Sequence, residues 1–212
     1  MAQNHEFELM HYWRSSCSWR LRWALSVKGL EFKSTPINLL KAEHKSPSYL
    51  KLNPSGAVPT LLVDGQPFSE SVAIIEWLEE EYPTHQLLPT SSKDKLIVRQ
   101  MAYVIASGTQ PLQNLAAQKY YSEDPDERLK YSQHWIKRGL ESFEAYCNQH
   151  SGSFSFGSQV TLADLCLIPQ CYNAARFGVE LEKYPNIDQI YQRCLEDQHC
   201  NESAPHNQPG AN

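Results

Sequence analysis

The sequence predicts a small α/β domain followed by an all-helical domain. Short stretches with the apolar pattern of strands occur only before residue 83, where they alternate with helical patterns. After about residue 90, apolar residues recur only at helical spacing. Residues 83–90 contain two prolines and show no periodicity, as is typical of a linker. We therefore expect domains at 1–82 and 91–212. The second should end, beyond Glu196, in a tail that lies over the surface or is partly disordered.

In the first domain, a strand over residues 7–13 is expected to lead into a helix over 16–28. Trp19, Trp23 and Val27 share one face of that helix, and Gly29 can end it. The other elements expected here are strands at 32–37 and 60–63, an Asp64-Gly65 turn, a short strand near Phe68 and a helix at 71–82.

The second domain is predicted to hold four helices. We expect them at 93–118, 125–148, 161–177 and 187–195. Thr161-Leu162-Ala163-Asp164 fits an N-terminal capping box at the start of the third. This spacing indicates that Asp164 stabilises the helix and takes no part in catalysis.

Composition excludes several classes of protein. The chain has 212 residues, 20% charged and 41% hydrophobic, with no apolar run long enough to cross a bilayer and a polar start, so we expect a cytoplasmic protein. A net charge of -5 without a Lys/Arg cluster argues against a nucleic-acid or anionic-membrane partner. The six cysteines lack regular spacing and any Cys-x-x-Cys pair, which predicts neither a disulfide framework nor a zinc site.

The most informative segment is Ser15-Ser16-Cys17, between the first predicted strand and the first helix. Amides in the first turn of a helix lack intrahelical acceptors and carry the positive end of the helix dipole. An anion, and a thiolate in particular, is favoured at such a position. The segment therefore predicts a binding site for a thiolate.

Two further features point to the same ligand. Pro59 directly precedes an apolar strand, and a cis Val58-Pro59 bond would leave the backbone of Val58 open to pair with an extended peptide. Glu70-Ser71 opens the next helix, where Ser71 can hold a carboxylate and Glu70 an ammonium group. Together these sites fit one zwitterionic peptide that bears a thiol.

These motifs identify a resemblance. Over about residues 7–177 the chain resembles the zeta class of glutathione transferases, and the segments that carry the match are Ser15-Ser16-Cys17-Ser18-Trp19-Arg20, Val58-Pro59-Thr60-Leu61, Glu70-Ser71, Gln110-Pro111-Leu112-Gln113-Asn114, Thr161-Leu162-Ala163-Asp164 and Asn173-Ala174-Ala175-Arg176-Phe177. The resemblance implies a thioredoxin-like N-terminal domain that binds glutathione, an all-helical C-terminal domain that shapes the second-substrate pocket, and a homodimer.

The resemblance also implies roles for individual residues. Ser15, Ser16 and Cys17 would surround the sulfur of glutathione, with Ser15 the principal activator. The residues implied to bind the rest of glutathione are Val58 at the cysteinyl unit, Glu70 and Ser71 at the γ-glutamyl end, His44 or alternatively Lys45 at the glycyl end, and Gln113 and Asn114.

The activity that the resemblance implies is glutathione-dependent isomerisation of maleylacetoacetate to fumarylacetoacetate, in tyrosine and phenylalanine catabolism. A helix terminus and a hydroxyl donor would together lower the thiol pKa from about 8.5 by roughly two to three. The thiolate then adds to the cis double bond, the new single bond rotates and the thiolate leaves. Arg14 and Arg176 are the candidates for binding the carboxylates and the enolate of this small dicarboxylic diketo acid.

Other interpretations stay open. Ser15 can be a helix cap alone, Tyr12 is a rival activator, and Ala116 stands where some relatives carry an arginine. The chain can instead be a transferase that conjugates or dehalogenates α-halo acids, a maleylpyruvate isomerase, or a non-catalytic binding module. A glutaredoxin-like reaction is disfavoured because the resolving thiol expected two residues past Cys17 is absent, with Trp19 and Arg20 in its place.

Overall fold

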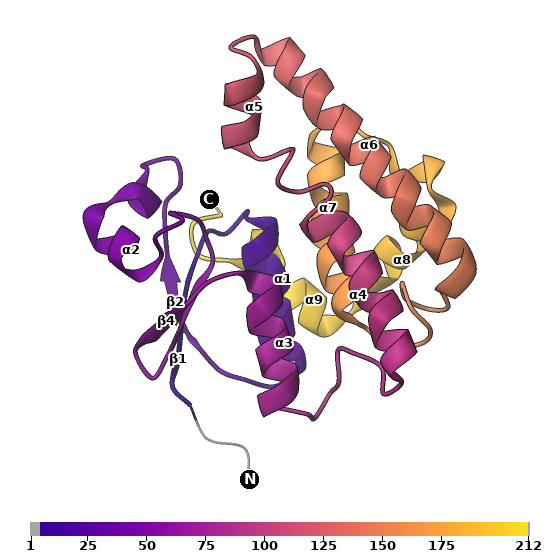
Figure 1. Cartoon of the computed structure of the whole chain (residues 1–212), viewed down its shortest axis with the longest axis horizontal. Helices are drawn as coiled ribbons and strands as arrows, with labels where there is room; N and C mark the ends of the chain where they lie inside the picture. Colours follow the sequence, from indigo (N-terminus) through magenta and orange to yellow (C-terminus); the bar gives the residue numbers. More distant parts are fainter. Residues whose placement is uncertain (1–4, 212) are drawn as a thin grey trace. The chain divides into compact units, whose positions relative to one another are not determined.

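The computed structural model describes residues 5–211 and divides the chain into two compact units. One unit runs to Gln86 and also includes the segment that begins at Gln198; the other is Leu87–Asp197. The chain can be followed through both units by its colour in Figure 1. The C-terminal segment thus groups with the α/β unit and not, as expected from the sequence, with the helical one.

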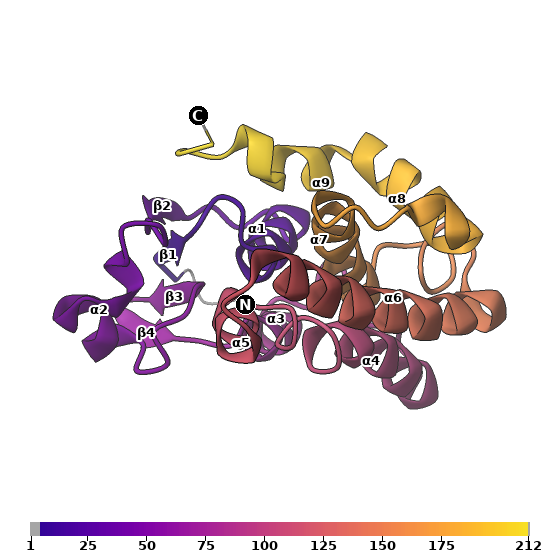
Figure 2. The same cartoon turned by 90° about the horizontal axis from the view of Figure 1, so that it is seen from above.

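A four-stranded sheet forms the centre of the first unit. Its order is β2 (Lys33–Pro36), β1 (Phe7–His11), β3 (Thr60–Val63) and β4 (Gln66–Phe68), as Figure 2 shows. β1 runs parallel to β2 and antiparallel to β3, and Leu9 and Leu61, which are paired across β1 and β3, are fully buried. Asp64 and Gly65 have φ values of 51° and 82°, so the predicted Asp-Gly hairpin turn is confirmed.

Two helices of the first unit confirm the sequence prediction within one residue at each end. They are α1 (Ser16–Val27) and α3 (Ser71–Glu81). The region predicted as a loop instead contains the 3-10 helix η1 (Glu43–Lys45) and the short helix α2 (Pro47–Leu52). Ser46 caps α2 by accepting a hydrogen bond from the Tyr49 amide, with Pro47 at the first helical position.

The C-terminal segment contains α9 (Gln198–Ser203) and the 3-10 helix η3 (Pro205–Asn207). α9 packs on α1 through Ser203, whose hydroxyl accepts a hydrogen bond from Trp19 Nε1 at 3.1 Å. Its backbone carbonyl accepts one from Arg22 Nε at 2.9 Å. Both α1 side chains are fully buried, so the segment completes the polar contacts of this core.

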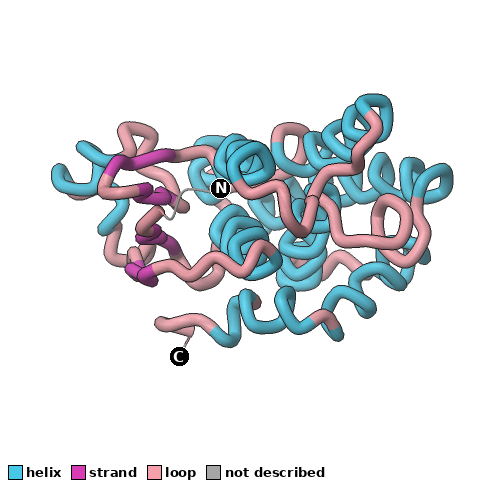
Figure 3. Tube along the Cα trace, turned by 90° about the horizontal axis from the view of Figure 1, so that it is seen from below, coloured by secondary structure: helices cyan, strands magenta, loops and turns pink. Residues whose placement is uncertain are grey.

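The described part of the second unit contains helices but no strand, as the colours in Figure 3 show. Its elements are α4 (Ser92–Ala106), α5 (Leu115–Tyr121), α6 (Pro125–His150), α7 (Leu162–Arg176), the 3-10 helix η2 (Leu181–Lys183) and α8 (Pro185–Glu196). The predicted helix 93–118 is therefore two helices. The break contains Gly108 and Pro111, which disfavour continuation of α4. No helix within residues 5–211 has both the length and the apolarity needed to span a membrane.

Asp164 has the structural role that the sequence predicts. It lies fully buried at the start of α7, and its carboxylate accepts hydrogen bonds from the backbone amides of Ser155 and Thr161, both at 2.8 Å. The Thr161 hydroxyl accepts in turn from the amide of Ala163, which completes the capping box.

His11, at the end of β1, is buried and neutral. Its Nδ1 accepts a hydrogen bond from the Arg22 guanidinium at 3.2 Å, because arginine has donors only, so Nε2 carries the proton and donates to Ser34 Oγ at 2.8 Å. Burial, and then the charge of Arg22, lower the pKa of His11 to about 4.

We expect the free energy of unfolding to fall as the pH falls from 6.5 to 4. In this range the unfolded chain protonates His11 and the folded chain does not, so the loss is about 1.4 kcal/mol per pH unit and about 3 kcal/mol in all. The variant His11→Asn keeps an acceptor for Arg22 and is expected to show a shallower slope by one proton. Urea unfolding at stepped pH measures both slopes, and equal slopes would contradict the assignment.

Candidate active site

Ser15 lies between β1 and α1 and caps that helix. Its backbone is extended, its Oγ accepts a hydrogen bond from the Ser18 amide at 3.2 Å, and its own amide donates to the Tyr12 carbonyl at 3.0 Å. The capping interpretation is thus confirmed, but it does not exclude a role toward a ligand. Capping uses the oxygen as an acceptor and leaves the hydroxyl hydrogen available as a donor.

Ser16 and Cys17 are the first two residues of α1, and both are half-buried. The first intrahelical hydrogen bond joins the Trp19 amide to the Ser15 carbonyl, so the amides of Ser16 and Cys17 precede this ladder. All three residues of the motif therefore lie at the positive end of the α1 dipole.

The Val58-Pro59 peptide bond is cis, the isomer that the sequence left open. Within residues 5–211, the amide and the carbonyl of Val58 take part in no hydrogen bond, and the pairing of β3 begins only at Thr60. Val58 therefore presents one backbone donor and one backbone acceptor, the pair of groups that an extended peptide uses for antiparallel pairing.

Glu70 and Ser71 form the start of α3. Glu70 is exposed and has φ 69°, a conformation that is strained for a residue other than glycine and often found at functional sites. Ser71 is buried, and its hydroxyl accepts a hydrogen bond from Arg20 Nη1 at 3.0 Å. Arg20, which is 1% exposed, thus fixes the hydroxyl of one candidate ligand residue.

The η1 segment approaches the chain just before Val58. Lys45 Nζ donates to the Gly56 carbonyl at 3.1 Å, and a Cβ atom on Gly56 would lie 2.8 Å from that nitrogen. His44 Nδ1 is buried without a hydrogen-bond partner among the described residues. Burial, and then the charge of Lys45, lower the pKa of His44, which favours the neutral imidazole.

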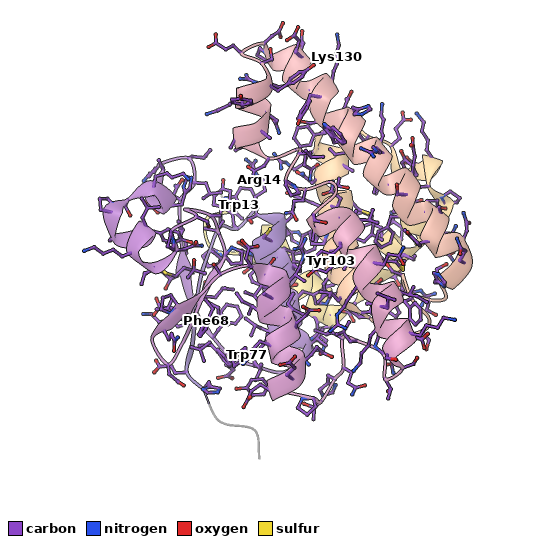
Figure 4. All side chains as sticks on the ribbon, viewed as in Figure 1. Trp13, Arg14, Phe68, Trp77, Tyr103 and Lys130 are labelled. Atoms are coloured by element: carbon purple, nitrogen blue, oxygen red, sulfur yellow. The ribbon has the colours of Figure 1, made fainter. Side chains whose placement is uncertain are left out.

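A cavity of about 410 Å³ lies beside the residues that precede Ser15. Its lining comprises Tyr12, Trp13, Arg14, Pro36, Ile37, Asn38, Leu40, Glu43 and Pro209 to Ala211. The Arg14 guanidinium lies over the Trp13 ring, 5.1 Å from its centroid, and Figure 4 labels both side chains. Arg14 thus brings a cation to a cavity next to Ser15. Tyr12 is 8% exposed and packs on Trp13.

In the second unit, Gln113 and Gln170 pair through their side-chain amides. The two hydrogen bonds are 2.6 and 3.0 Å long, and both residues are buried. Asn114 is exposed at the N-cap of α5, where its side chain makes no capping bond. Arg176 is exposed at the end of α7 and donates to Asn173 Oδ1 at 3.0 Å. The amide pair anchors the segment that carries Asn114 to α7.

The sequence left open whether Arg20 and Arg22 are structural or solvated, and it did not single out Ser203. The structure buries all three side chains. The sequence carried a partial signal for their burial, because apolar residues occur on all sides of α1. In the structure, every residue from Ser18 to Leu25 is buried. Such a pattern is typical of a helix covered all round.

The comparisons with known proteins agree with this geometry. The family model for the glutathione S-transferase N-terminal domain matches residues 14–81, and the C-terminal model matches 111–201. The maleylacetoacetate isomerase of Dictyostelium discoideum is 43% identical over 208 residues, with 96% of this chain and 95% of the relative covered. The glutathione S-transferase zeta class of Euphorbia esula is 40% identical, with 96% and 92% covered. The chain belongs to the zeta class of the glutathione S-transferases.

A solved structure shows the same likeness in the fold. The maleylacetoacetate isomerase of Anaeromyxobacter dehalogenans, with glutathione bound in the active site, has a TM-score of 0.91 and 37% identity, with 99% of this chain and all of that chain covered. A second structure of that protein holds dicarboxyethyl glutathione and citrate. The predicted thioredoxin-like domain, the all-helical domain, the enzyme class and the cofactor glutathione are confirmed.

The cap of α1 can be separated from any role of Ser15 toward a ligand. We expect Ser15→Ala to lower the free energy of unfolding by about 1 kcal/mol because the Ser18 amide loses its acceptor. Ser15→Asp keeps an acceptor at the cap and is expected to retain stability within a few tenths of that of the unchanged protein. Chemical unfolding measures both; equal stability of Ser15→Ala and the unchanged protein would exclude the capping role.

Proposed function

We propose that this protein is a glutathione-dependent isomerase that converts maleylacetoacetate to fumarylacetoacetate. The observation that carries the proposal is Ser15, whose capping bond fixes its oxygen at the start of α1 while its hydrogen can still be donated. The likeness to relatives named maleylacetoacetate isomerase supports the choice of substrate.

The residues of the first unit fit the parts of glutathione. The amide and carbonyl of Val58 suit its cysteinyl backbone, and Glu70 and Ser71 suit its γ-glutamyl ammonium and carboxylate. His44, with a buried unpartnered nitrogen, is the candidate at the glycyl end, since Lys45 already bonds the Gly56 carbonyl. Gln113 and Asn114 remain further candidates from the second unit.

Bound glutathione supplies a thiolate that adds reversibly to the cis double bond, which allows rotation before the thiolate leaves. The protein's task is to keep that sulfur ionised. Ser15 Oγ–H donates to it, and the first-turn amides of α1 add the positive end of the helix dipole. Ser16 and Cys17 flank the sulfur from the same turn. No histidine base is needed, because the nucleophile is also the leaving group.

The substrate's negative groups require cations. Arg14 lines the cavity beside Ser15 and is the candidate for one carboxylate or the developing enolate oxygen. Arg176, exposed in the second unit, is the candidate for the other carboxylate. The citrate and dicarboxyethyl glutathione in the related structure are ligands of this charge class.

We also propose that the protein is a homodimer and cytoplasmic. A hollow of about 530 Å³ on the first unit has a mixed lining. Apolar residues of β3, β4 and α3 line it, among them Phe68 and Trp77, which Figure 4 labels, together with the polar residues His5, Asp64, Gln66, Ser69 and Glu81. Phe68 is 43% exposed. A second copy is the occupant we propose for this surface. A reaction that uses reduced glutathione and regenerates it in each turnover suits a reducing compartment such as the cytoplasm.

Purified protein with glutathione is expected to isomerise maleylacetone, a short analogue of the substrate. Ser15→Ala should lose about 10²- to 10³-fold in kcat/KM, because one donor to the reacting sulfur is removed, whereas Cys17→Ala should lose far less. Ser15→Asp is the matched control: it keeps the cap but opposes the thiolate by its charge, so it too should be inactive. Loss of ultraviolet absorbance measures the rates. Full activity of folded Ser15→Asp would refute the donor role.

A substrate panel decides between the isomerase and its alternatives. We expect turnover of maleylacetone above that of maleylpyruvate and of dichloroacetate, each measured with the same enzyme and glutathione. Turnover of dichloroacetate alone would favour the conjugating transferase, and turnover of maleylpyruvate alone would favour the related isomerase, for which a structural neighbour of that name has a TM-score of 0.93.

The dimer has its own test. We expect sedimentation to give twice the mass of the chain and Phe68→Glu to give a monomer, because a buried unpaired charge opposes association. Leu40→Glu, at a residue 77% exposed on the first unit but outside this hollow, is the control and should stay dimeric. A monomeric unchanged protein would exclude the proposed interface.

A further inference from the structure

Arg22 is a buried cation that has only neutral partners. It is 1% exposed, and its guanidinium donates to the Ser203 carbonyl at 2.9 Å, the Trp13 carbonyl at 3.1 Å and His11 Nδ1 at 3.2 Å. Within residues 5–211, no carboxylate lies within ion-pairing distance of it. Buried charges are normally paired, so an unpaired guanidinium at this position lowers the stability of the fold. Its presence therefore indicates a role other than stabilisation.

The guanidinium nevertheless keeps its charge. Burial lowers the pKa of Arg22 to about 9, which still leaves it protonated at neutral pH. His11 is neutral beside it, since its own pKa is about 4. The positive charge is therefore neither compensated by a counter-ion nor screened by direct contact with water.

The position of this charge relates it to Ser15. Side chains of a helix point toward its N-terminus, and Nη2 of Arg22 reaches the Trp13 carbonyl, two residues before Ser15 in the chain. Arg22 follows Ser15 by seven residues, which correspond to about 10 Å along the helix axis. Because the side chain of Arg22 points back toward Ser15, its charge lies no farther than this from Ser15 along the axis. The positive charge of Arg22 therefore lies toward the N-terminal end of α1, where the helix dipole is also positive.

Three of the other charged or titratable groups near α1 have partners of their own. Glu79 pairs with Lys28, Glu8 with Lys33, and His199 bonds Ser26. Arg20 is a second buried cation on α1, and it donates to Ser71 Oγ. The remaining such groups on α1, on the elements that pack against it, or close to them, are Arg14, Cys17, Glu6, Glu70, Glu76, Glu80, Glu81, Cys200 and Glu202.

We propose that Arg22 is a positioning residue of the thiolate site, whose charge favours the ionised sulfur of glutathione beside Ser15. Its bond to the Trp13 carbonyl also fixes the backbone that leads into Ser15. The Ser203 carbonyl of the C-terminal segment holds the guanidinium in this place. The inference rests on the proposed function, because it concerns the same sulfur.

Lys28 provides a matched control at the opposite end of α1. It is also buried, but its Nζ is paired with Glu79 at 2.5 Å and donates to the Tyr82 carbonyl at 2.8 Å. Loss of Lys28 should therefore lower stability as loss of Arg22 does, without a change in the potential near Ser15.

The experiment measures the thiol pKa of bound glutathione by its ultraviolet thiolate absorbance, together with the affinity for glutathione across pH. Arg22→Met is expected to raise this pKa by about one pH unit, as one charge at about 10 Å in a protein environment does. Lys28→Met and Arg22→Lys, which keeps the charge, are expected to leave it unchanged. At a pH below both thiol pKa values, where the thiol binds protonated, the affinity of Arg22→Met should match that of the unchanged protein.

A second variant keeps the test independent of the folding of Arg22→Met. His11→Asp retains Arg22 and gives it a carboxylate partner, so it should also raise the thiol pKa. An unshifted thiol pKa in folded Arg22→Met or in His11→Asp, or a shift equal to theirs in Lys28→Met, would overturn the role of Arg22. An ordinary thiol pKa in the unchanged protein would instead overturn the proposed function itself.

Discussion

The burial of α1 on all sides is the constraint on which the rest of the first unit depends. A helix that carries Trp19, Trp23 and two arginines in a dry environment is stable only if acceptors are supplied for most of its polar groups. Those acceptors come from distant parts of the chain: Ser71 for Arg20, and Trp13 and Ser203 for Arg22. The same hydrogen bonds hold the segments that would bind glutathione. The proposed site therefore forms only when the core around α1 is packed.

The proposed glutathione site is built from helix beginnings and from backbone groups, with few specialised side chains. Ser15 and Ser71 each lie at the start of a helix, and Val58 contributes only its amide and carbonyl. Such groups are fixed by the fold and need little reorganisation when charge develops near them. Such an arrangement can stabilise a thiolate without a histidine that acts as a base.

Local chemistry made much of this predictable from the sequence. The Asp-Gly turn, the cis proline, the cap at Ser15 and the box around Asp164 each depend on neighbouring residues, and each was found where expected. The division of residues 93–118 into two helices was missed because helical periodicity continues past the break at Gly108 and Pro111. The bond between Arg22 and Ser203 could not be predicted for another reason. The two residues are 181 positions apart, so no pattern of neighbouring residues indicates that they meet.

The return of the last residues to the first unit has a consequence for biosynthesis. A ribosome releases the segment that contains Ser203 only after the whole helical unit has been made. Until then, Trp19 and Arg22 in the nascent chain lack the acceptors that bury them, so the earliest part of the polypeptide is among the last to reach its native state. A fragment cut after Gln86 would be left permanently at that unfinished stage.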